Sequence, residues 1–534
     1  MHQRENILLI TLVGILLIFT GCGAASGFLS SSSEESSDNT TDTVVGGNIS
    51  AVTFSGSESE ISLSDIAEND SLILLLFTNS SSSSSSAFQV GSSSLNSYLL
   101  DNSEDDADDE NLTSDFHEIL RNFEADLDDA ALIDDSTDAE QSSIKFASKG
   151  SEKSFKVLNS FSSSSNYDTV TATLRYQTTY FNFYVDNRNV SDLDDSDLEE
   201  LAEQFNDVIP AEKELFGEES DINNDDRFTV LFTQTVNELG AAAGGMVTGF
   251  FYAADLFDSS SYPISNEMEI FYTFVPDNSG DYGSAVSKSF AMTNIYPGVL
   301  PHEYQHMISF NQHYNINEST VETSWLNEAL SHLAEDIHSI NSQNYMTATG
   351  LENPARIRGY LSDISSTCFS CGSNLYQRGG SYLFLRYLYE QAELGNITQL
   401  ADGADLIGKL LDTSLTSKAN IINAVYGDEG TEDQFKDLVG LFGLAVYLSN
   451  TGMTSDNRFG FKGINIRSTQ DDNRGTILNG PAVHEISDLP FTDTITGSGI
   501  HYMQISGADI IKNGYKIDIT TSTSSDFGGY VIQE

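Results

Sequence analysis

Basic residues are scarce in this chain. Its 534 residues include 24 lysines and arginines against 80 aspartates and glutamates, which gives a formal net charge of −56. Recognition of nucleic-acid phosphates requires clustered basic side chains, so nucleic acid is not expected as a partner. Such a charge bears on solubility and association rather than on fold. An acidic surface suited to a saline habitat is the simpler interpretation, and a preference for basic peptides is the alternative.

Cysteine is also rare, with three in the chain. This number excludes a scaffold held together by many disulfides. Cys368 and Cys371 form a C-x-x-C pair, which in an exported chain predicts a small disulfide loop. A thioredoxin-like redox motif is the alternative, but no strand–helix context supports it. A second zinc site would need two more soft ligands nearby, and the sequence has none there.

Long apolar runs are absent after the first 20 residues. Ile7–Thr20 is a short apolar core behind Arg4, and this layout predicts a secretory signal peptide over residues 1–21. The core is too short for a mature transmembrane helix. The small residues before Cys22 resemble the lipobox of bacterial lipoproteins. We therefore expect Cys22 to be lipidated and to anchor an exported chain in the bacterial envelope, at the outer membrane or cell surface; ordinary cleavage near Ala25 is the alternative.

The first segments after the signal peptide differ sharply in composition. Residues 22–47 are rich in serine, threonine and acidic residues, which is typical of a disordered tether. Residues 48–100 contain apolar runs such as Ser71–Phe77 and predict a small β-domain. Residues 101–165 are acidic, and we interpret them as a linker or spacer, with part of a propeptide as the alternative.

The rest of the chain predicts an α+β fold. Residues 166–455 begin with strand patterns, including an edge strand at Gly244–Tyr252, and continue with helical patterns. Residues 456–534 return to strand patterns and predict a β-sandwich-like domain that binds carbohydrate or protein, or is merely structural. The strands expected there are Ile464–Ile466, His501–Ile505 and Tyr515–Ile519.

An H-E-x-x-H motif lies at His302–His306. Residues i and i+4 lie on the same face of a helix, so both histidines can direct a ring nitrogen at one metal ion. Glu303 lies beside them and can act on a water molecule at that metal. Two histidines and a carboxylate, with one open position, are the ligands of a catalytic zinc site. An amphipathic helix that merely carries two histidines is the alternative.

The segment around Glu328 supplies the expected third ligand. Ser324 is a plausible N-cap of a second helix, and Glu328 lies in its first turn. Apolar residues at helical spacing then predict a buried stripe. Glu322 is the next candidate ligand if Glu328 is not the one.

These motifs resemble the gluzincin clan of zinc metallopeptidases, which includes thermolysin. The match rests on P-H-E-Y-Q-H-M-I at residues 301–308, on W-L-N-E at 325–328 and on the acidic turn at 221–226. Their context most resembles the hyicolysin family of secreted bacterial metallopeptidases, over roughly residues 165–450. The resemblance implies a thermolysin-like domain with a mixed sheet, an edge strand that pairs with extended substrate, the H-E-x-x-H helix and a helical C-terminal lobe. Small β-domains are expected on both sides of it.

The resemblance also implies roles for residues outside the motif. Glu303 would be the general base, and Tyr376, in a Y-x-R-G sequence where Y-x-K-G is usual, would stabilise the transition state. A carboxylate seven residues after the ligand glutamate would steady a zinc histidine. Here that position is Glu335, with Asp336 as its close rival. Should Tyr376 prove structural, Tyr382 or His332 would be the next candidate.

Two residues near the H-E-x-x-H motif depart from its usual pattern. Pro301 directly precedes His302, so we expect the helix either to start near residues 297–299 or to bend at the metal site, and to be poorly formed upstream of Leu300. His313 is one residue out of register for a metzincin ligand, and we expect it at the surface.

The oxygen atoms of Asp221, Asn223 and Asp225 have a spacing that suits calcium. No glycine or terminal bidentate glutamate stands at EF-hand spacing, so an acidic β-turn is favoured and calcium binding is the alternative.

The sequence thus predicts a zinc metalloendopeptidase that acts on peptide or protein substrates. Endopeptidase activity is favoured because no amine-recognising glutamate motif precedes the zinc helix. An aminopeptidase of the same clan is one alternative. A non-catalytic surface lipoprotein or adhesin with a structural zinc site is the other, and a structural site would require neither Glu303 nor Tyr376.

Overall fold

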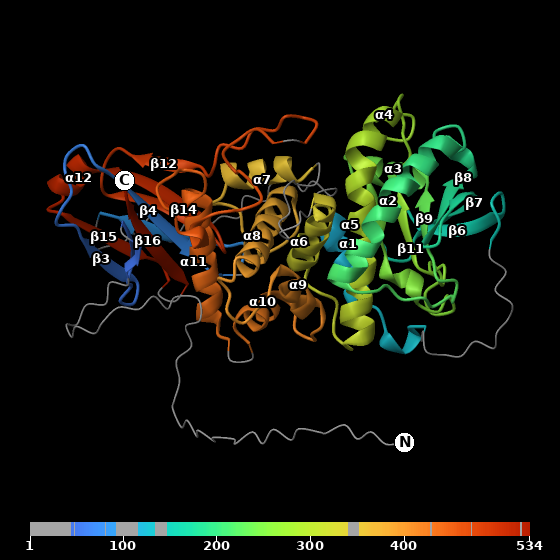
Figure 1. Ribbon diagram of the computed structural model, residues 1–534, viewed down its shortest axis with the longest axis horizontal. Coiled ribbons are helices and arrows are strands. Elements are labelled where there is room, and N and C mark those ends of the chain that lie inside the picture. Colours follow the sequence, from blue (N-terminus) through green and yellow to red (C-terminus); the bar gives the residue numbers. More distant parts are fainter. Residues whose placement is uncertain are drawn as a thin grey trace, which may run out of the picture.

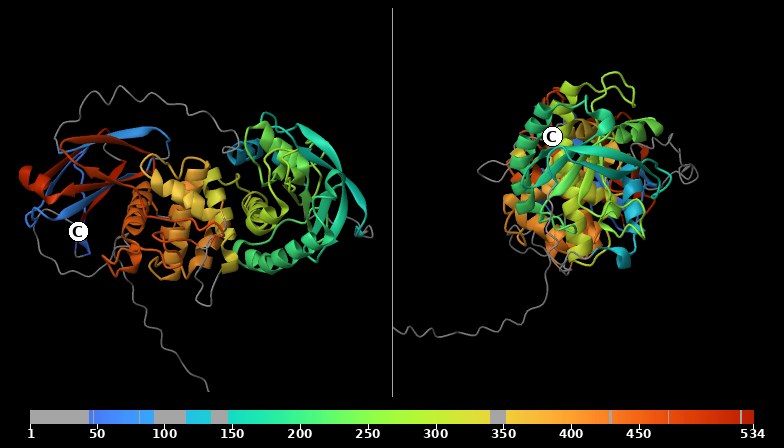
Figure 2. Two further views of the ribbon diagram at one scale, coloured as in Figure 1. Left: turned by 90° about the horizontal axis from the view of Figure 1, so that it is seen from above. Right: turned by 90° about the vertical axis from the view of Figure 1, so that its right-hand side faces the viewer.

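The molecule is elongated and has three parts in a row. A β-sandwich containing the C-terminus lies at one end, helices lie in the middle, and a mixed sheet with its own helices lies at the other end (Figure 1). Figure 2 shows the same order from above. Cys22 and most of the predicted tether lie outside the described residues. The computed structural model describes residues 44–46, 48–80, 82–91, 116–133, 147–339, 352–427, 430–470, 472–523 and 526–534.

The mixed sheet has six strands and ends in the predicted edge strand. Its order is β10-β11-β9-β8-β7-β6, with β8, β9 and β11 parallel and β10 antiparallel to β11. β6 starts at Glu152, so the sheet already begins inside the predicted linker 101–165. The strands are β6 (Glu152–Leu158), β7 (Tyr167–Gln177), β8 (Phe181–Asp186), β9 (Phe228–Phe232), β10 (Gly249–Phe251) and β11 (Ile270–Thr273).

Helices cover the mixed sheet and continue into the centre of the molecule. The central helices α8 and α11 are almost wholly buried, because their apolar residues are spread around the helix and not confined to one stripe. The helices are α1 (Phe116–Ala125), α2 (Asp195–Phe216), α3 (Gln234–Ala242), α4 (Lys288–Phe290), α5 (Tyr296–Phe310), α6 (Ser324–Ala334), α7 (Asn353–Ser362), α8 (Leu375–Glu393), α9 (Gly403–Leu411), α10 (Ser417–Tyr426), α11 (Glu432–Leu448) and α12 (Gly507–Lys512).

The N-terminal and C-terminal strands together form one β-sandwich. The expectation of separate small β-domains is therefore wrong, because β4 pairs with both β14 and β16. The sheets have the orders β1-β2-β16-β4-β14-β12 and β13-β5-β15-β3. The strands are β1 (Val44–Gly46), β2 (Ile49–Ala51), β3 (Glu58–Ser62), β4 (Ser71–Thr78), β5 (Ser85–Val90), β12 (Val483–Ile486), β13 (Phe491–Thr496), β14 (Ile500–Ser506), β15 (Lys516–Thr521) and β16 (Phe527–Gln533).

The continuous apolar sequence of β4 has a structural cause. Successive side chains of a strand point to opposite faces, so a strand buried on both faces needs no polar alternation. Leu72, Leu74 and Leu76 belong to the core between the two sheets, whereas Leu75 and Phe77 join the main core that includes α11. The strand thereby joins the sandwich to the central helices.

Two predictions of local structure are wrong. The motif helix is not poorly formed upstream of Leu300: α5 starts at Tyr296, with Pro297 in its first turn, and is preceded by a π-helical turn at Ala291–Ile295. Pro301 lies inside α5. No strand is formed at Ile464–Ile466.

None of the helices in the described part of the chain combines the length and the apolar character that crossing a bilayer requires.

Candidate metal centre

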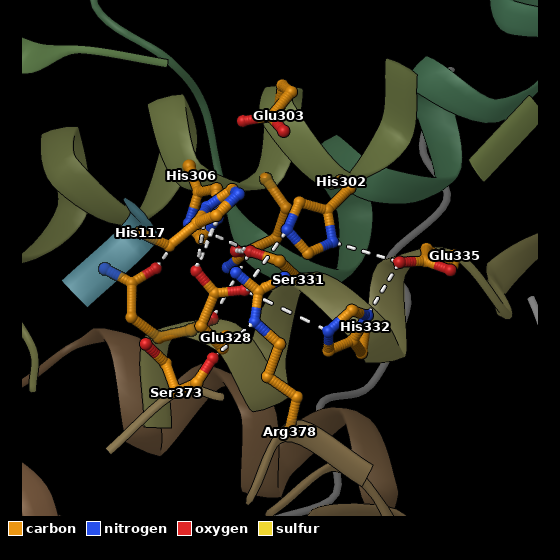
Figure 3. A network of polar contacts seen from close by, with 12 residues as sticks. His117, His302, Glu303, His306, Glu328, Ser331, His332, Glu335, Ser373 and Arg378 are labelled. Carbon is orange, nitrogen blue, oxygen red and sulfur yellow. Dashed lines mark hydrogen bonds and ion pairs between the residues drawn. The ribbon is translucent and has the colours of Figure 1, made fainter. Parts of the chain in front are cut away.

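The three predicted ligands lie together between two helices. α5 supplies His302 and His306 from consecutive turns, and α6 supplies Glu328 from the facing helix (Figure 3). Nε2 of His302 lies 3.4 Å from one carboxylate oxygen of Glu328, and Nε2 of His306 lies 3.5 Å from the other. All three side chains are buried.

The atoms that face the centre of this cluster fit a metal ion. Nε2 of His302, Nε2 of His306 and both carboxylate oxygens of Glu328 are buried, and none has a hydrogen-bond partner among the described residues, although ion pairs surround them. Buried polar atoms nearly always have a hydrogen-bond partner, so a group of potential ligand atoms that converge on one point without such partners requires an explanation. Two imidazoles and a carboxylate suit zinc, which would satisfy all of them.

The outer nitrogen of each histidine is held by another side chain. Nδ1 of His302 lies 3.0 Å from Oε1 of Glu335, and Nδ1 of His306 lies 2.5 Å from Oδ1 of Asn327. Contacts of this kind fix the orientation and tautomer of a metal-binding imidazole. Asp336, the rival of Glu335, instead accepts hydrogen bonds from Tyr382 and Arg386.

Burial and charged neighbours shift the pKa values of the cluster residues in different directions. Burial would lower the pKa of His302, but the carboxylates of Glu328 and Glu335 raise it to about 9. Burial would raise the pKa of Glu328, but Arg378 and His117 hold it well below its usual range. Burial lowers the pKa of His306 to about 4, so that ring is neutral at pH 7, as metal binding requires.

Glu303 lies beside the cluster and touches the edge strand. The backbone N–H of Phe251 in β10 donates a 3.0 Å hydrogen bond to its Oε2. Burial raises the pKa of Glu303 to about 7, although the neighbouring His302 opposes that shift. A carboxyl group that titrates near neutrality can both accept and return a proton.

A cavity of about 270 Å³ opens over Glu303 and His302. Its wall includes three arginines, Arg356, Arg378 and Arg474, which stand out in so acidic a protein. Arg474 is neutralised by an ion pair with Glu352. The guanidinium of Arg378 is buried and lies 3.1 Å from Oε2 of Glu328.

Tyr376 does not occupy its predicted place. Among the described residues, it belongs neither to the cluster nor to the cavity wall, and 47% of the residue is exposed. Its ring lies against Gly359 of α7. Tyr376 is the second residue of α8, and the residue of that helix that turns toward Glu328 is Arg378, two positions later.

A fourth residue at the cluster was not predicted. His117 of α1 directs Nδ1 at Glu328, 3.1 Å away, and its ring centroid lies about 6 Å from those of His302 and His306. Potential ligand atoms of all four residues lie within 4.8 Å of one another. In the sequence, His117 is a single histidine in an acidic segment, and nothing in that pattern points to metal.

Glu322, His332 and His313 do not belong to the four-residue cluster. Glu322 accepts hydrogen bonds from Ser417, Asn420 and Thr323 and is not part of the cluster. His332 contacts Glu335 through Nδ1 at 2.7 Å. The prediction of a surface position for His313 is wrong, because its side chain is buried 4.0 Å from Glu322.

Side-chain oxygens of the predicted calcium turn accept hydrogen bonds from the backbone of the same turn. Side chains of Asp221 and Asn223 accept hydrogen bonds from the backbone N–H of Asp225. Calcium binding there remains a prediction.

Cys368 and Cys371 form a disulfide, with their Cα atoms 5.4 Å apart.

Comparison with known proteins gives a distant homology to a metalloprotease. The chain is 28% identical over 240 residues to the neutral metalloprotease ShpI of Staphylococcus hyicus, and this alignment covers 42% of the chain and 48% of that protein. The chain therefore spans about half the length of the curated relative that it matches. No family model matches. The alignment with a neutral metalloprotease and the buried histidine–glutamate cluster are two separate observations about this chain.

Proposed function

We propose that the protein is a zinc-dependent endopeptidase whose metal is held by His302, His306 and Glu328. The observation that carries this proposal is the set of buried, unsatisfied ligand atoms that converge beside Glu303. The similarity to a neutral metalloprotease supports the same reaction class. When bound, zinc supplies Lewis acidity toward water and a peptide carbonyl.

Glu303 is the proposed general base and acid. Its carboxylate accepts a proton from the attacking water, and the resulting carboxylic acid gives that proton to the leaving nitrogen of the peptide. The pKa of about 7 suits both steps, and the hydrogen bond from Phe251 holds one oxygen in place. Glu335 and Asn327 are positioning residues, because they orient the two histidines from outside.

Substrate is proposed to lie along the outward edge of β10. The backbone groups on the outward side of this strand are those of Gly249 and Phe251, of which the N–H of Phe251 is already donated to Glu303. An extended peptide can add to such an edge through backbone hydrogen bonds. We assign to Arg378, rather than to Tyr376, the stabilisation of negative charge on the peptide carbonyl oxygen, because its buried guanidinium borders the same cavity as Glu303.

The test combines metal analysis with digestion of blocked peptides. We expect one zinc per chain and internal cleavage of peptides blocked at both ends, with loss of cleavage on chelation and recovery on adding zinc. An aminopeptidase would leave the blocked peptides intact. Zinc binding without cleavage of any peptide would favour the non-catalytic lipoprotein or adhesin.

We also propose that Cys22 carries a lipid anchor in the bacterial envelope. The supporting feature is the short apolar segment that ends at this cysteine. Cys22→Ala is expected to release the protein from the membrane fraction and to abolish labelling by a fatty-acid probe. Membrane association without labelling would indicate an uncleaved signal segment instead.

A further inference from the structure

Helix α1 enters the proposed active site from a part of the chain outside the predicted peptidase domain. One face of the helix carries His117, Arg121 and Glu124 at a spacing of four and three residues, so the three side chains point the same way. His117 reaches the metal cluster (Figure 3), whereas Arg121 and Glu124 reach β10 and the residues just after it.

His117 has the properties of a metal ligand. Its Nδ1 is buried and, among the described residues, has no hydrogen bond of good geometry, as is the case for Nε2 of His302 and Nε2 of His306. The side chain is 14% exposed. Three imidazoles and one carboxylate complete a tetrahedral zinc shell, and a complete shell leaves no position for water.

The rest of α1 forms hydrogen bonds with backbone groups at the end of the edge strand, where an extended substrate would bind, and just beyond it. Arg121 donates a 3.0 Å hydrogen bond to the carbonyl of Phe251, and the N–H of Ala253 donates a 2.9 Å bond to Glu124. Arg121 and Glu124 also form an ion pair of 2.8 Å, so neither charge is left uncompensated. The carbonyl of Phe251 is on the side of the edge strand that faces away from β11, and Ala253 lies just beyond the strand, at the start of a 3-10 helix.

The chain after α1 contacts the segment that follows β10. Residue 133 donates its N–H to the carbonyl of Leu256 at 3.2 Å, and Asp258 donates its N–H to the carbonyl of Ala131 at 2.8 Å. At the other end, the ring of Phe116 packs edge-on against Phe250 at 5.5 Å. Residues 116–133 thus contact the end of the edge strand at Phe250 and Phe251 and the segment that follows it as far as Asp258.

We propose that His117 is a fourth protein ligand of the metal and that residues 116–133 act as a built-in inhibitor. This segment completes the zinc shell and occupies the substrate edge, so the form described is latent. Release of α1 would vacate the position needed by water and expose β10. The ligand assignment stands on the geometry alone, whereas the inhibitory role rests on the proposed peptidase function.

The experiment measures the zinc ligands and the activity of the same full-length samples. X-ray absorption of the zinc-loaded protein should give three imidazoles per zinc in the wild type and two in His117→Ala, with zinc still bound. Hydrolysis of a blocked, internally quenched peptide should rise about tenfold or more in His117→Ala, because the competent form is no longer a minor one. His117→Gln is the conservative second variant, and His484→Ala, at an exposed histidine of β12, is the control.

A further variant tests the contact with the edge strand. Arg121→Gln should lower the KM for peptide and leave kcat almost unchanged, because it weakens an internal competitor without touching the zinc ligands. An unchanged or higher KM would overturn the inhibitory role of α1.

The outcomes separate this inference from the proposed function. An unchanged imidazole count in His117→Ala and His117→Gln would overturn the ligand assignment, whether or not peptides are cleaved. A fall from three imidazoles to two, with no hydrolysis by any variant, would overturn the peptidase function and the inhibitory role together. It would support His117 as a ligand of a structural zinc site.

Discussion

Oε1 of Glu335 lies 3.0 Å from Nδ1 of His302, on the far side of the ring from Glu328. One imidazole is thereby held between two carboxylates, one facing the metal position and one behind it. The outer carboxylate fixes the ring and strengthens its donor nitrogen. It is supplied by the residue just after α6, which ends at Ala334.

The first prediction follows from this contact. Glu335→Gln should weaken zinc binding by about 10–100-fold, the usual effect of losing such a partner. Asp336→Asn is the matched control, because Asp336 contacts Tyr382 and Arg386 instead of a cluster histidine. It should lower stability and leave zinc affinity nearly unchanged. Competition with a chromogenic chelator measures both affinities, and equal losses in the two variants would contradict the assignment.

A second prediction separates the base from the ligands. Glu303→Gln should retain one zinc per chain and lose about 10²–10⁴-fold in turnover, because an amide cannot accept the proton. The loss of turnover is best measured in protein that also carries His117→Ala, because the starting activity is expected to be highest there. Persistent turnover, or loss of zinc, would remove Glu303 from its proposed role.

The third ligand can be tested against a neighbouring glutamate. Glu328→Ala should lose zinc, since it removes both oxygens that face the histidines. Glu322→Gln should keep zinc and lower the melting temperature, because Glu322 accepts hydrogen bonds from Ser417 and Asn420 outside the cluster. Metal analysis and thermal unfolding of the two variants decide between them. Zinc retained by Glu328→Ala would move the ligand elsewhere.

The fourth prediction sets Arg378 against Tyr376. Arg378→Met should reduce kcat by about 10²–10³-fold, the scale for a lost oxyanion donor. Arg378→Lys should recover only part of it, because an ammonium lacks the planar fork of donors. Tyr376→Phe should turn over almost normally, as its ring lies against Gly359. A large loss in Tyr376→Phe with little loss in Arg378→Met would reverse the two roles.

A fifth prediction concerns stability and pH. Glu212 is fully buried in α2, and both carboxylate oxygens lack a hydrogen-bond partner in the described part of the chain. Burial, together with the nearby charge of Glu219, raises its pKa well above the usual 4.5. The folded protein therefore holds a proton that the unfolded chain releases. Its stabilising effect is complete below pH 4.5 and is lost as pH rises toward the folded pKa, by about 1.4 kcal/mol per pH unit.

Glu212→Gln should remove this pH dependence. The variant should be more stable than the wild type at pH 8 and gain little at pH 4.5. Glu214→Gln, on the exposed face of the same helix, is the control and should show no such difference. Urea unfolding at several pH values measures the effect, and parallel curves for wild type and Glu212→Gln would contradict it.

The local features of this protein could be predicted from the sequence. The i, i+4 spacing places His302 and His306 on one face wherever the helix packs, and Glu328 falls on the next helix. The apolar run of β4 required burial on both faces, and the edge strand formed at Gly249–Phe251, within the longer stretch 244–252 predicted for it. These results depend on near neighbours in the chain, whose geometry the backbone fixes.

Tertiary structure alone decided which distant residues meet. Glu335 and Asp336 are adjacent, and only the packing of α6 against α5 determines which of them reaches His302. Arg378, and not Tyr376, faces Glu328, because α8 packs against α7 with the tyrosine ring at Gly359. No local pattern brings His117 to Glu328, since more than two hundred residues separate them and their contact depends on how α1 packs against α6.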